Sequence, residues 1–109
     1  MIGEARYREA LLTRERLRHI YESFMAPYGA LVTPPATGEA PADLTQTGDP
    51  TFCTIWTLLG APAAAIPVGL GSHRLPLGLQ IVGACGRDAA LLAAAVWCER
   101  ALPFAALRD

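Results

Sequence analysis

The sequence contains no lysine, because its nine basic side chains are all arginine, and ten acidic side chains balance them. The missing lysine excludes the phosphate-binding loop of nucleotide hydrolases, so the Gly-Leu-Gly-Ser stretch at 69–72 is not such a loop. The near balance of charge gives no electrostatic reason to expect nucleic acid or an anionic membrane as a partner. Serine is almost as scarce as lysine, since it occurs only at Ser23 and Ser72.

Cysteine is also rare, and its spacing argues against a disulfide-stabilised protein and against a metal-binding one. Cys53, Cys85 and Cys98 are odd in number and contain no C-x-x-C pair, which argues against a disulfide framework and favours a reducing compartment. We interpret each as a buried structural thiol in apolar surroundings. Together with His19 and His73 they show no spacing typical of metal ligands, so no metal site is expected.

No hydrophobic run approaches the roughly 20 residues that a membrane-spanning helix needs. The first 17 residues are crowded with charge, unlike a secretory signal peptide. We therefore expect a soluble, cytoplasmic protein that contacts no membrane. The chain has 109 residues, of which 52% are hydrophobic and 17% charged, so one domain over 1–109 with one core is predicted.

Hydrophobic periodicity and turn residues predict the first half of the fold. A helix over 4–25 carries apolar side chains on one face and interleaved Arg and Glu on the other, with an ion pair between Glu4 and Arg8. A short strand at 30–33 precedes a loop over 34–48, and loops of this length are often functional. The next helix is expected to have Asp49 as its N-cap, to begin at Pro50 and to end at Gly60.

The second half of the sequence predicts two strands and a helix. The apolar runs 63–68 and 75–82 favour strands buried on both faces and joined as a hairpin. Pro67 and Pro76 restrict these strands to sheet edges, strand starts or bulges. The last helix, 89–102 with Asp88 as its N-cap, is apolar on nearly every side and needs cover from more than one direction.

These elements follow one another in the order α-β-loop-α-β-β-α, which predicts an α/β fold with helices packed on a small sheet. Strands of this type and an all-round apolar helix would leave edges and apolar faces exposed in a chain of this size. The domain is therefore expected to be partial, as a piece of a larger sheet.

Five stretches of the sequence, in a fixed order, point to a family. They are A-L-V-T-P-P-A (30–36), T-G-D-P-T-F (47–52), W-T-L-L-G-A-P-A-A-A-I-P-V-G (56–69), L-P-L-G-L-Q-I-V-G (75–83) and R-D-A-A-L-L-A-A-A (87–95). Together they resemble the closing segment of the amidase-signature family, over about 7–102. The resemblance implies a large mixed sheet with helices on both sides, of which this chain forms the C-terminal flank. The family hydrolyses amides without a metal or organic cofactor, so no cofactor is expected.

The resemblance also implies a catalytic triad of two serines, one of them in a cis peptide, and a lysine. Such a triad passes the nucleophile's proton to a base while backbone N–H groups stabilise the oxyanion. In the family these residues precede the segment that this chain resembles. Neither Ser23 nor Ser72 lies in a matching Gly/Ser-rich signature, and lysine is absent. No catalytic residue is assigned, and we expect the isolated chain to be inactive.

Three residues are candidates for substrate binding, because the resemblance places 47–56 near the mouth of the active site. Asp49 is the nearest match to an acidic residue that contacts the substrate amine in the tRNA-dependent, glutamine-using branch, although helix capping also explains it. Phe52 and Trp56 line an apolar pocket or face the core as a helical stripe, and both interpretations stay open. Gln80 is expected to hydrogen-bond within the fold.

Two functional interpretations follow. In the first, the chain is part of an amide hydrolase, as an excerpt of a longer chain, as a split half that a complementary N-terminal chain completes, or as an inactive remnant. In the second, it is a non-enzymatic interaction domain that uses its apolar last helix as a partner surface, for example in a homo-oligomer. Within the family, a simple amidase and the tRNA-dependent amidotransferase branch both remain open.

Overall fold

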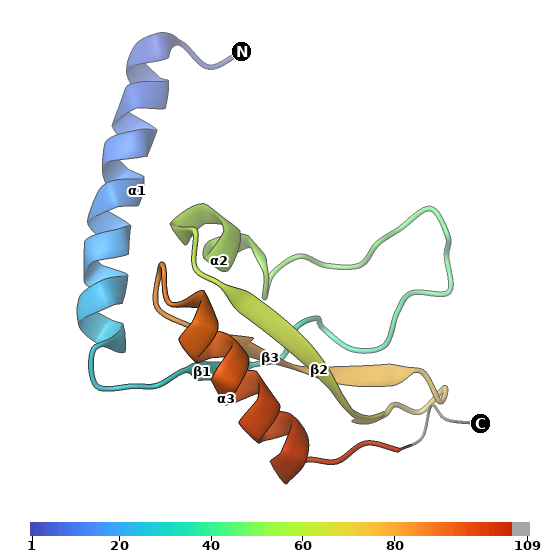
Figure 1. The fold of residues 1–109 in the computed structure, drawn as a ribbon. Helices are drawn as coiled ribbons and strands as arrows, with labels where there is room; N and C mark the ends of the chain where they lie inside the picture. The colour runs from blue at the N-terminus through green and yellow to red at the C-terminus, as the bar shows by residue number, and fades with distance from the viewer. Residues whose placement is uncertain (106–109) are drawn as a thin grey trace.

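The computed structural model describes residues 1–105, and the last four residues of the predicted domain, 106–109, lie outside the described part. The predicted order of helices and strands is confirmed (Figure 1). The elements are α1 (Glu4–Met25), β1 (Leu31–Thr33), α2 (Thr54–Leu59), β2 (Ala63–Leu70), β3 (Pro76–Val82) and α3 (Asp88–Ala101).

The three strands form one antiparallel sheet in the order β1-β3-β2. Val82 at the end of β3 lies opposite Leu31 on one side and Ala63 on the other. The outer strand β2 has a register irregularity just after Pro67, and Pro76 is the first residue of β3. Both prolines therefore occupy positions in which a missing backbone N–H is tolerated, as predicted.

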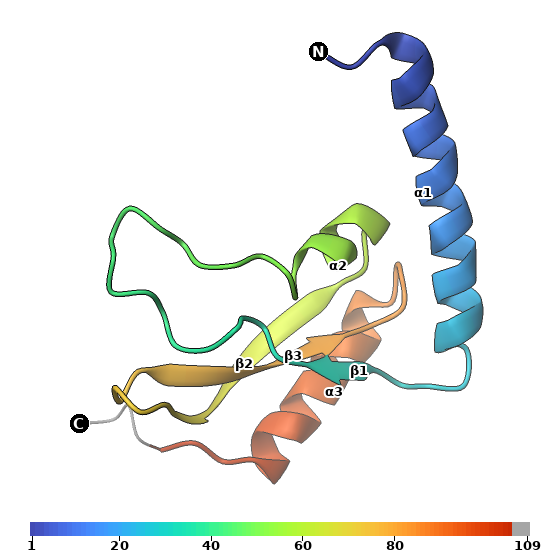
Figure 2. The ribbon, with the colours of Figure 1, turned by 180° about the vertical axis from the view of Figure 1, so that it is seen from behind.

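Successive side chains of β3 point to opposite faces of the sheet and supply two separate cores, rather than the one core that the sequence predicted. Val82 and Ile81 are both fully buried. One core consists of Tyr21, Met25, Leu59 and Val82, beneath α1 and α2. The other consists of Ile66, Ile81, Leu91 and Ala95, beneath α3. Figure 2, seen from behind, shows the sheet between these two groups of helices.

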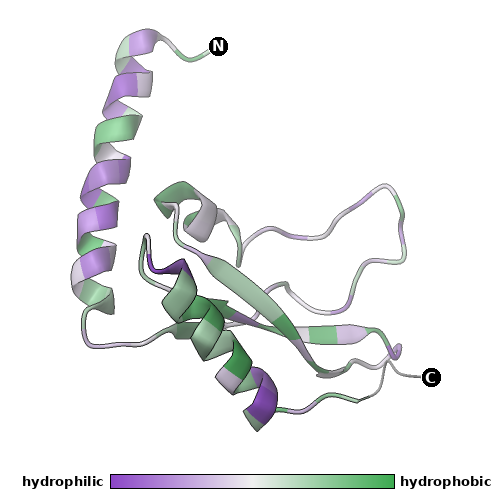
Figure 3. Ribbon diagram, in the orientation of Figure 1, coloured by the Kyte–Doolittle hydropathy of each residue, from purple (hydrophilic) through white to green (hydrophobic). Residues whose placement is uncertain are grey.

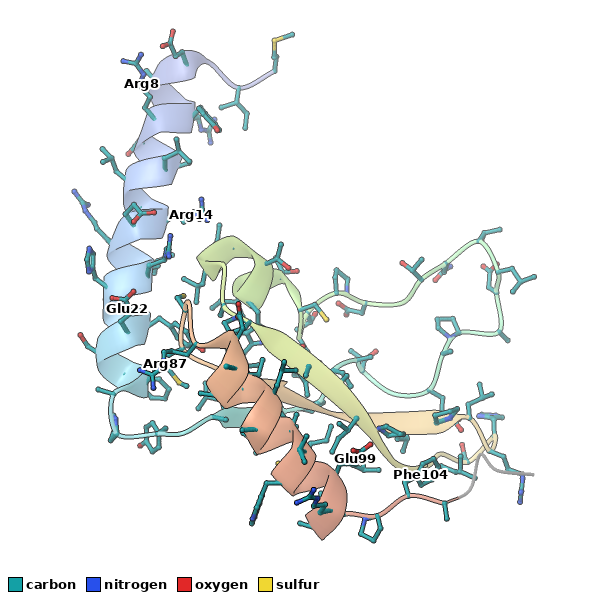
Figure 4. All side chains as sticks on the ribbon, in the orientation of Figure 1. Arg8, Arg14, Glu22, Arg87, Glu99 and Phe104 are labelled. Carbon is teal, nitrogen blue, oxygen red and sulfur yellow. The ribbon has the colours of Figure 1, made fainter. Side chains whose placement is uncertain are left out.

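Two side-chain hydrogen bonds hold α1 to the rest of the molecule. Near its C-terminal end the buried Tyr21 hydroxyl donates to the Gly83 carbonyl oxygen, at 2.7 Å. Nearer the N-terminal end of α1, Arg14 donates from Nε to the Leu58 carbonyl oxygen of α2, also at 2.7 Å (Figure 4). The far end of α1 extends away from the sheet, where the predicted ion pair between Arg8 and Glu4 is confirmed at 2.5 Å.

The second helix begins later than predicted. α2 starts at Thr54 and its N-cap is Cys53, so the prediction of Asp49 as N-cap and Pro50 as first helical residue is wrong. Residues 50–53 instead form a turn in which the Pro50 carbonyl oxygen accepts from the amides of Cys53 and Thr54. The predicted end at Gly60 is confirmed, and its left-handed φ of 69° is one that glycine adopts without strain.

Two further predictions are corrected. Asp88 is the first residue of α3 rather than its N-cap, which is Arg87, and the helix ends at Ala101 rather than at 102. The Asp88 carboxylate still lies in the first turn, where the helix dipole favours negative charge. Cys53 is exposed rather than buried, because it lies on the turn before α2, and Cys85 and Cys98 are half-buried. None of the three forms a disulfide.

The described chain is flat and leaves much apolar surface uncovered. It measures 54 × 38 × 17 Å with a radius of gyration of 16.7 Å, against about 13 Å for a compact chain of this length. Leu92 and Trp97 on the outer side of α3 are 60% and 71% exposed, and Ile20 of α1 is 66% exposed. Figure 3 shows apolar residues along most of α3. Only one side of that helix is covered within residues 1–105.

We predict that Tyr21→Phe lowers the free energy of unfolding by about 1–3 kcal/mol, because it leaves the buried Gly83 carbonyl without its donor. Urea unfolding followed by circular dichroism measures the change. Tyr28→Phe is the matched control, since that side chain is 55% exposed. Equal midpoints for the two variants would show that the Tyr21 hydrogen bond contributes nothing to stability.

Candidate functional site

The loop over 34–48 connects β1 to the turn before α2, and both of its ends meet at Gln80. This side chain is 6% exposed and donates from Nε2 to Thr33 Oγ1 and to the Phe52 carbonyl oxygen, each at 2.8 Å. A buried amide needs such partners. The prediction that Gln80 hydrogen-bonds within the fold is confirmed.

A close approach between Pro35 and β3 fixes the first residues of this loop. A Cβ atom on Gly78 would lie 2.9 Å from Pro35 Cγ, so only glycine lets the proline ring pack on the strand at this distance. The Cys53 thiol also donates to the Pro35 carbonyl oxygen, at 3.2 Å. The beginning of the loop is therefore held against both β3 and the turn before α2.

Glu39, in the middle of the loop, binds the turn that joins β2 to β3. Its Oε1 accepts from the backbone amides of His73 and Leu75, each at 3.0 Å, and its Oε2 lies 2.7 Å from His73 Nδ1. The Glu39 side chain is only 12% exposed. Desolvation alone would raise the pKa of the carboxyl, but the hydrogen bonds from His73 and Leu75 outweigh it and hold the pKa below its usual range.

A serine, a histidine and an acid thus lie together, but they do not form a catalytic relay. Ser72 Oγ lies 3.3 Å from His73 Nδ1, which is the same ring nitrogen that faces Glu39. A relay needs the acid on one nitrogen and the nucleophile on the other. The His73 side chain is also 81% exposed. The cluster is therefore a structural contact between loop and turn.

Asp49, at the other end of the loop, is exposed and accepts two hydrogen bonds from Thr51. The Thr51 amide donates to Asp49 Oδ1 at 2.9 Å, and the Thr51 hydroxyl donates to the same oxygen. The hydrogen bond from the Thr51 hydroxyl, and to a smaller extent the one from the Thr51 amide, hold the pKa of the Asp49 carboxyl below its usual range. Desolvation raises this pKa, but its effect is smaller. Asp49 therefore caps the turn before α2 and is ionised at neutral pH.

Two adjoining hollows bring two of the three candidate residues together. Asp49 lines a hollow of about 280 Å³ between the two arms of the loop. Phe52 lines a neighbouring one of about 350 Å³. The residues common to both are Pro35, Ala36, Thr37, Gly38 and Gly78. The Asp49 carboxylate and the Phe52 ring thus border a continuous surface formed by the loop and the start of β3, and Glu39 also lines the first hollow.

Trp56 lies apart from this pair. It lines an apolar groove of about 280 Å³ between α1 and α2 and packs against the core beneath them, with its ring centre 6.0 Å from that of Tyr21. Its indole Nε1 is buried and has no hydrogen-bond partner among the described residues. Trp56 thus lines an apolar groove and also packs against the core, so both alternatives that the sequence left open describe part of its surroundings.

Glu39 is the residue of this site that the sequence did not single out. Its partners His73 and Leu75 lie 34 and 36 positions further along the chain, and no periodicity connects them. A usable signal is the composition of the loop, which is rich in Pro, Ala, Thr and Gly and has no hydrophobic periodicity, so its backbone groups need polar partners. Among residues 1–105 no three His, Cys, Asp or Glu side chains gather where they could hold a metal ion. No helix in this part of the chain is long and apolar enough to cross a membrane.

The fold is that of known amidases. A crystal structure described as an amidase superposes with a TM-score of 0.79 at 32% sequence identity, over 93% of this chain and 26% of that one. The structure of 6-aminohexanoate cyclic dimer hydrolase complexed with substrate also has a TM-score of 0.79, at 24% identity, over 99% of this chain and 27% of that one. The latter similarity concerns the fold alone.

Sequence comparison gives the family. The family model Amidase matches residues 1–92. The A-subunit of the glutamyl-tRNA(Gln) amidotransferase of Alkaliphilus metalliredigens (strain QYMF) is 30% identical over 91% of this chain, which spans 22% of that protein. The 6-aminohexanoate-cyclic-dimer hydrolase of Pseudomonas sp. (strain NK87) is 42% identical over 52% of this chain and 12% of its own length. The chain belongs to the amidase family, and it spans about a fifth or less of the length of these relatives.

We predict that Thr51→Val raises the pKa of Asp49 toward its usual value, because the hydroxyl donor that stabilises the carboxylate is removed. Thr45→Val is the matched control, since Thr45 binds Asp43 in the same way and lowers the pKa of that carboxyl. Titration of the two carboxyl carbons by NMR should show each variant moving its own aspartate alone. If Asp49 does not respond to Thr51→Val, its hydrogen bond to that hydroxyl does not form in solution.

Proposed function

We propose that this chain is the C-terminal part of an amide hydrolase and builds one flank of its sheet and one wall of its substrate site. The catalytic serines and lysine come from the remainder of a longer polypeptide or from a complementary N-terminal chain. A cytoplasmic location, favoured by three cysteines outside any disulfide, belongs to the same proposal. The family match supports the reaction class, and the uncovered apolar surface supports the incomplete state of the fold.

The uncovered surface is the observation that carries the proposal. The outer side of α3 exposes Leu92, Val96 and Trp97, which lie on the side away from the buried Leu91 and Ala95. β1 and β2 each pair with β3 on one side only. Contiguous apolar faces and unpaired strand edges favour association with further protein. The remaining four fifths of a relative's length would supply that cover.

Asp49 and Phe52 are the residues that we propose to contact the substrate. An ionised carboxylate beside an aromatic ring suits an amide whose amine end is cationic and whose body is apolar. Trp56 contributes indirectly, because it packs beneath α1 and α2 and supports the helix that follows Phe52. The names of the relatives, a tRNA-dependent amidotransferase and a cyclic-dimer hydrolase, leave two substrate classes for this site.

A non-enzymatic interaction domain is the second candidate function. The same outer side of α3 supports it, since a helix exposing Leu92 and Trp97 is also a suitable surface for a partner or a second copy of this chain. In that case the loop-lined hollows would bind no substrate.

The two candidates differ in the native size of the protein. Immunoblots of its own cells on denaturing and native gels should show the sequence inside a longer polypeptide, or as an 11.6 kDa chain that travels natively with a larger one. Either result supports the hydrolase. An 11.6 kDa chain found alone or as a homo-oligomer would contradict it and favour an interaction domain or an inactive remnant.

We also predict that the purified 109-residue chain hydrolyses no simple aryl amide above a buffer blank. It contains no lysine to act as a base and no Gly/Ser-rich nucleophile signature. Adding the complementary chain, or extending the polypeptide with the missing segment, should restore hydrolysis. Measurable turnover by the 109-residue chain alone would overturn the assignment of the chemistry to another segment.

A further inference from the structure

The 34–48 loop is held at its middle by a single carboxylate. Glu39 contacts two backbone amides and one ring nitrogen of the turn between β2 and β3. Gly71 makes this contact possible, because a Cβ atom at that position would overlap Glu39 Cδ. The missing side chain at Gly71 leaves the space that the mostly buried Glu39 carboxylate occupies, so the contact is specific to this pair of residues.

The contact connects to Asp49 through the other arm of the loop. Pro41, two residues after Glu39, faces Gly48 across the loop, since a Cβ atom built on Gly48 would lie 3.7 Å from Pro41 Cγ. Gly48, directly before Asp49, has a φ of 97°, which is a left-handed backbone conformation that glycine adopts without strain. Glu39, Pro41, Gly48 and Asp49 all line the same hollow. Glu39 on one arm of the loop and Asp49 on the other therefore border the same space.

We propose that Glu39 is a positioning residue, which binds the β2–β3 turn and thereby fixes the 34–48 loop and the Asp49 carboxylate at the wall of the candidate substrate site. Its role in substrate binding rests on the proposed function, whereas the mechanical connection from Glu39 to Asp49 does not. The Glu39 carboxylate binds the β2–β3 turn and the Asp49 carboxylate binds Thr51, so the effect passes through the backbone of the loop.

Glu39 is ionised at neutral pH, because its hydrogen bonds hold the pKa of the carboxyl below its usual range. His73 is the ionisable group in contact with Glu39 from the turn, and Arg74 is the other charged residue of that turn. The folded pKa of Glu39 lies below the unfolded one, so its stabilising contribution is present above the unfolded pKa. That contribution is lost as the pH falls through the lowered folded pKa.

Hydrogen exchange measured by NMR at neutral pH, on the protein in its native assembly, tests the connection. The amides of His73 and Leu75 report the contact itself, and the amide of Thr51, which donates to Asp49, reports its transmission. Glu39→Gln removes the charge, whereas Gly71→Ala displaces the carboxylate and keeps every charge. Gly29→Ala is the control, because a Cβ atom there meets nothing within 4 Å. Persistent protection of the Ile81 amide in β3 shows that each variant folds.

We expect each of the first two variants to accelerate exchange at Thr51 roughly tenfold and Gly29→Ala to leave it unchanged. The double variant Glu39→Gln/Gly71→Ala should exchange no faster than either single one, because both remove the same contact. Faster exchange at His73 and Leu75 with no change at Thr51 would overturn the proposal, since Glu39 would then only cap the turn. No change at any of the three amides would overturn it as well.

Kinetics of the complete hydrolase supply the second measurement. If Glu39 positions a substrate-binding wall, Glu39→Gln and Gly71→Ala raise KM several-fold and leave kcat within about twofold. A fall in kcat at constant KM would indicate lost active protein and would contradict a positioning role. If the wild-type assembly hydrolyses no amide, the proposed function fails, while exchange at Thr51 still decides the connection between Glu39 and Asp49.

Discussion

The central strand β3 is the element on which the rest of the structure depends. Its backbone pairs with β1 on one side and β2 on the other, and its adjacent residues Ile81 and Val82 are both fully buried. Because successive side chains point to opposite faces, one strand supplies the floor of two cores. α3 packs over one face, and α1 with α2 over the other. A charged residue at either position would remove a core.

The same strand organises the candidate site from its opposite end. Gly78 admits Pro35, and Gln80 joins the two ends of the 34–48 loop. Glu39 then binds the turn that leads into β3. The loop is thus held by the Pro35 ring packed at Gly78, by one buried amide and by one carboxylate. This arrangement leaves the hollows beside Asp49 and Phe52 open while the backbone around them is fixed.

The proposal that this chain is part of a longer amidase accounts for the uncovered apolar surface. The chain spans 22% of a relative, and the partners of its strands and helices would then lie in the other segments of such a protein. The buried Trp56 Nε1, which has no partner among residues 1–105, and the exposed Trp97 of α3 are consistent with surfaces made for further contacts. The family match and the shape of the described chain therefore support the same proposal from independent observations.

The sequence by itself determined the order of the elements and the helix end at Gly60, because both depend on periodicity or on near neighbours in the chain. It also predicted that Gln80 hydrogen-bonds within the fold, although the partners Thr33 and Phe52 lie 47 and 28 positions away. It was wrong about the N-cap of α2, which is Cys53 and not Asp49, because Asp49 instead binds Thr51 in the turn before the helix. The tertiary structure alone decided what depends on distant segments. Only the structure shows that Cys53 is exposed and that α2 begins at Thr54. It also shows that Trp56 lines a different groove from Asp49 and Phe52, and that Glu39 binds a turn 34 positions away. Local propensity carries no information about such contacts, since they form only when the loop closes over β3.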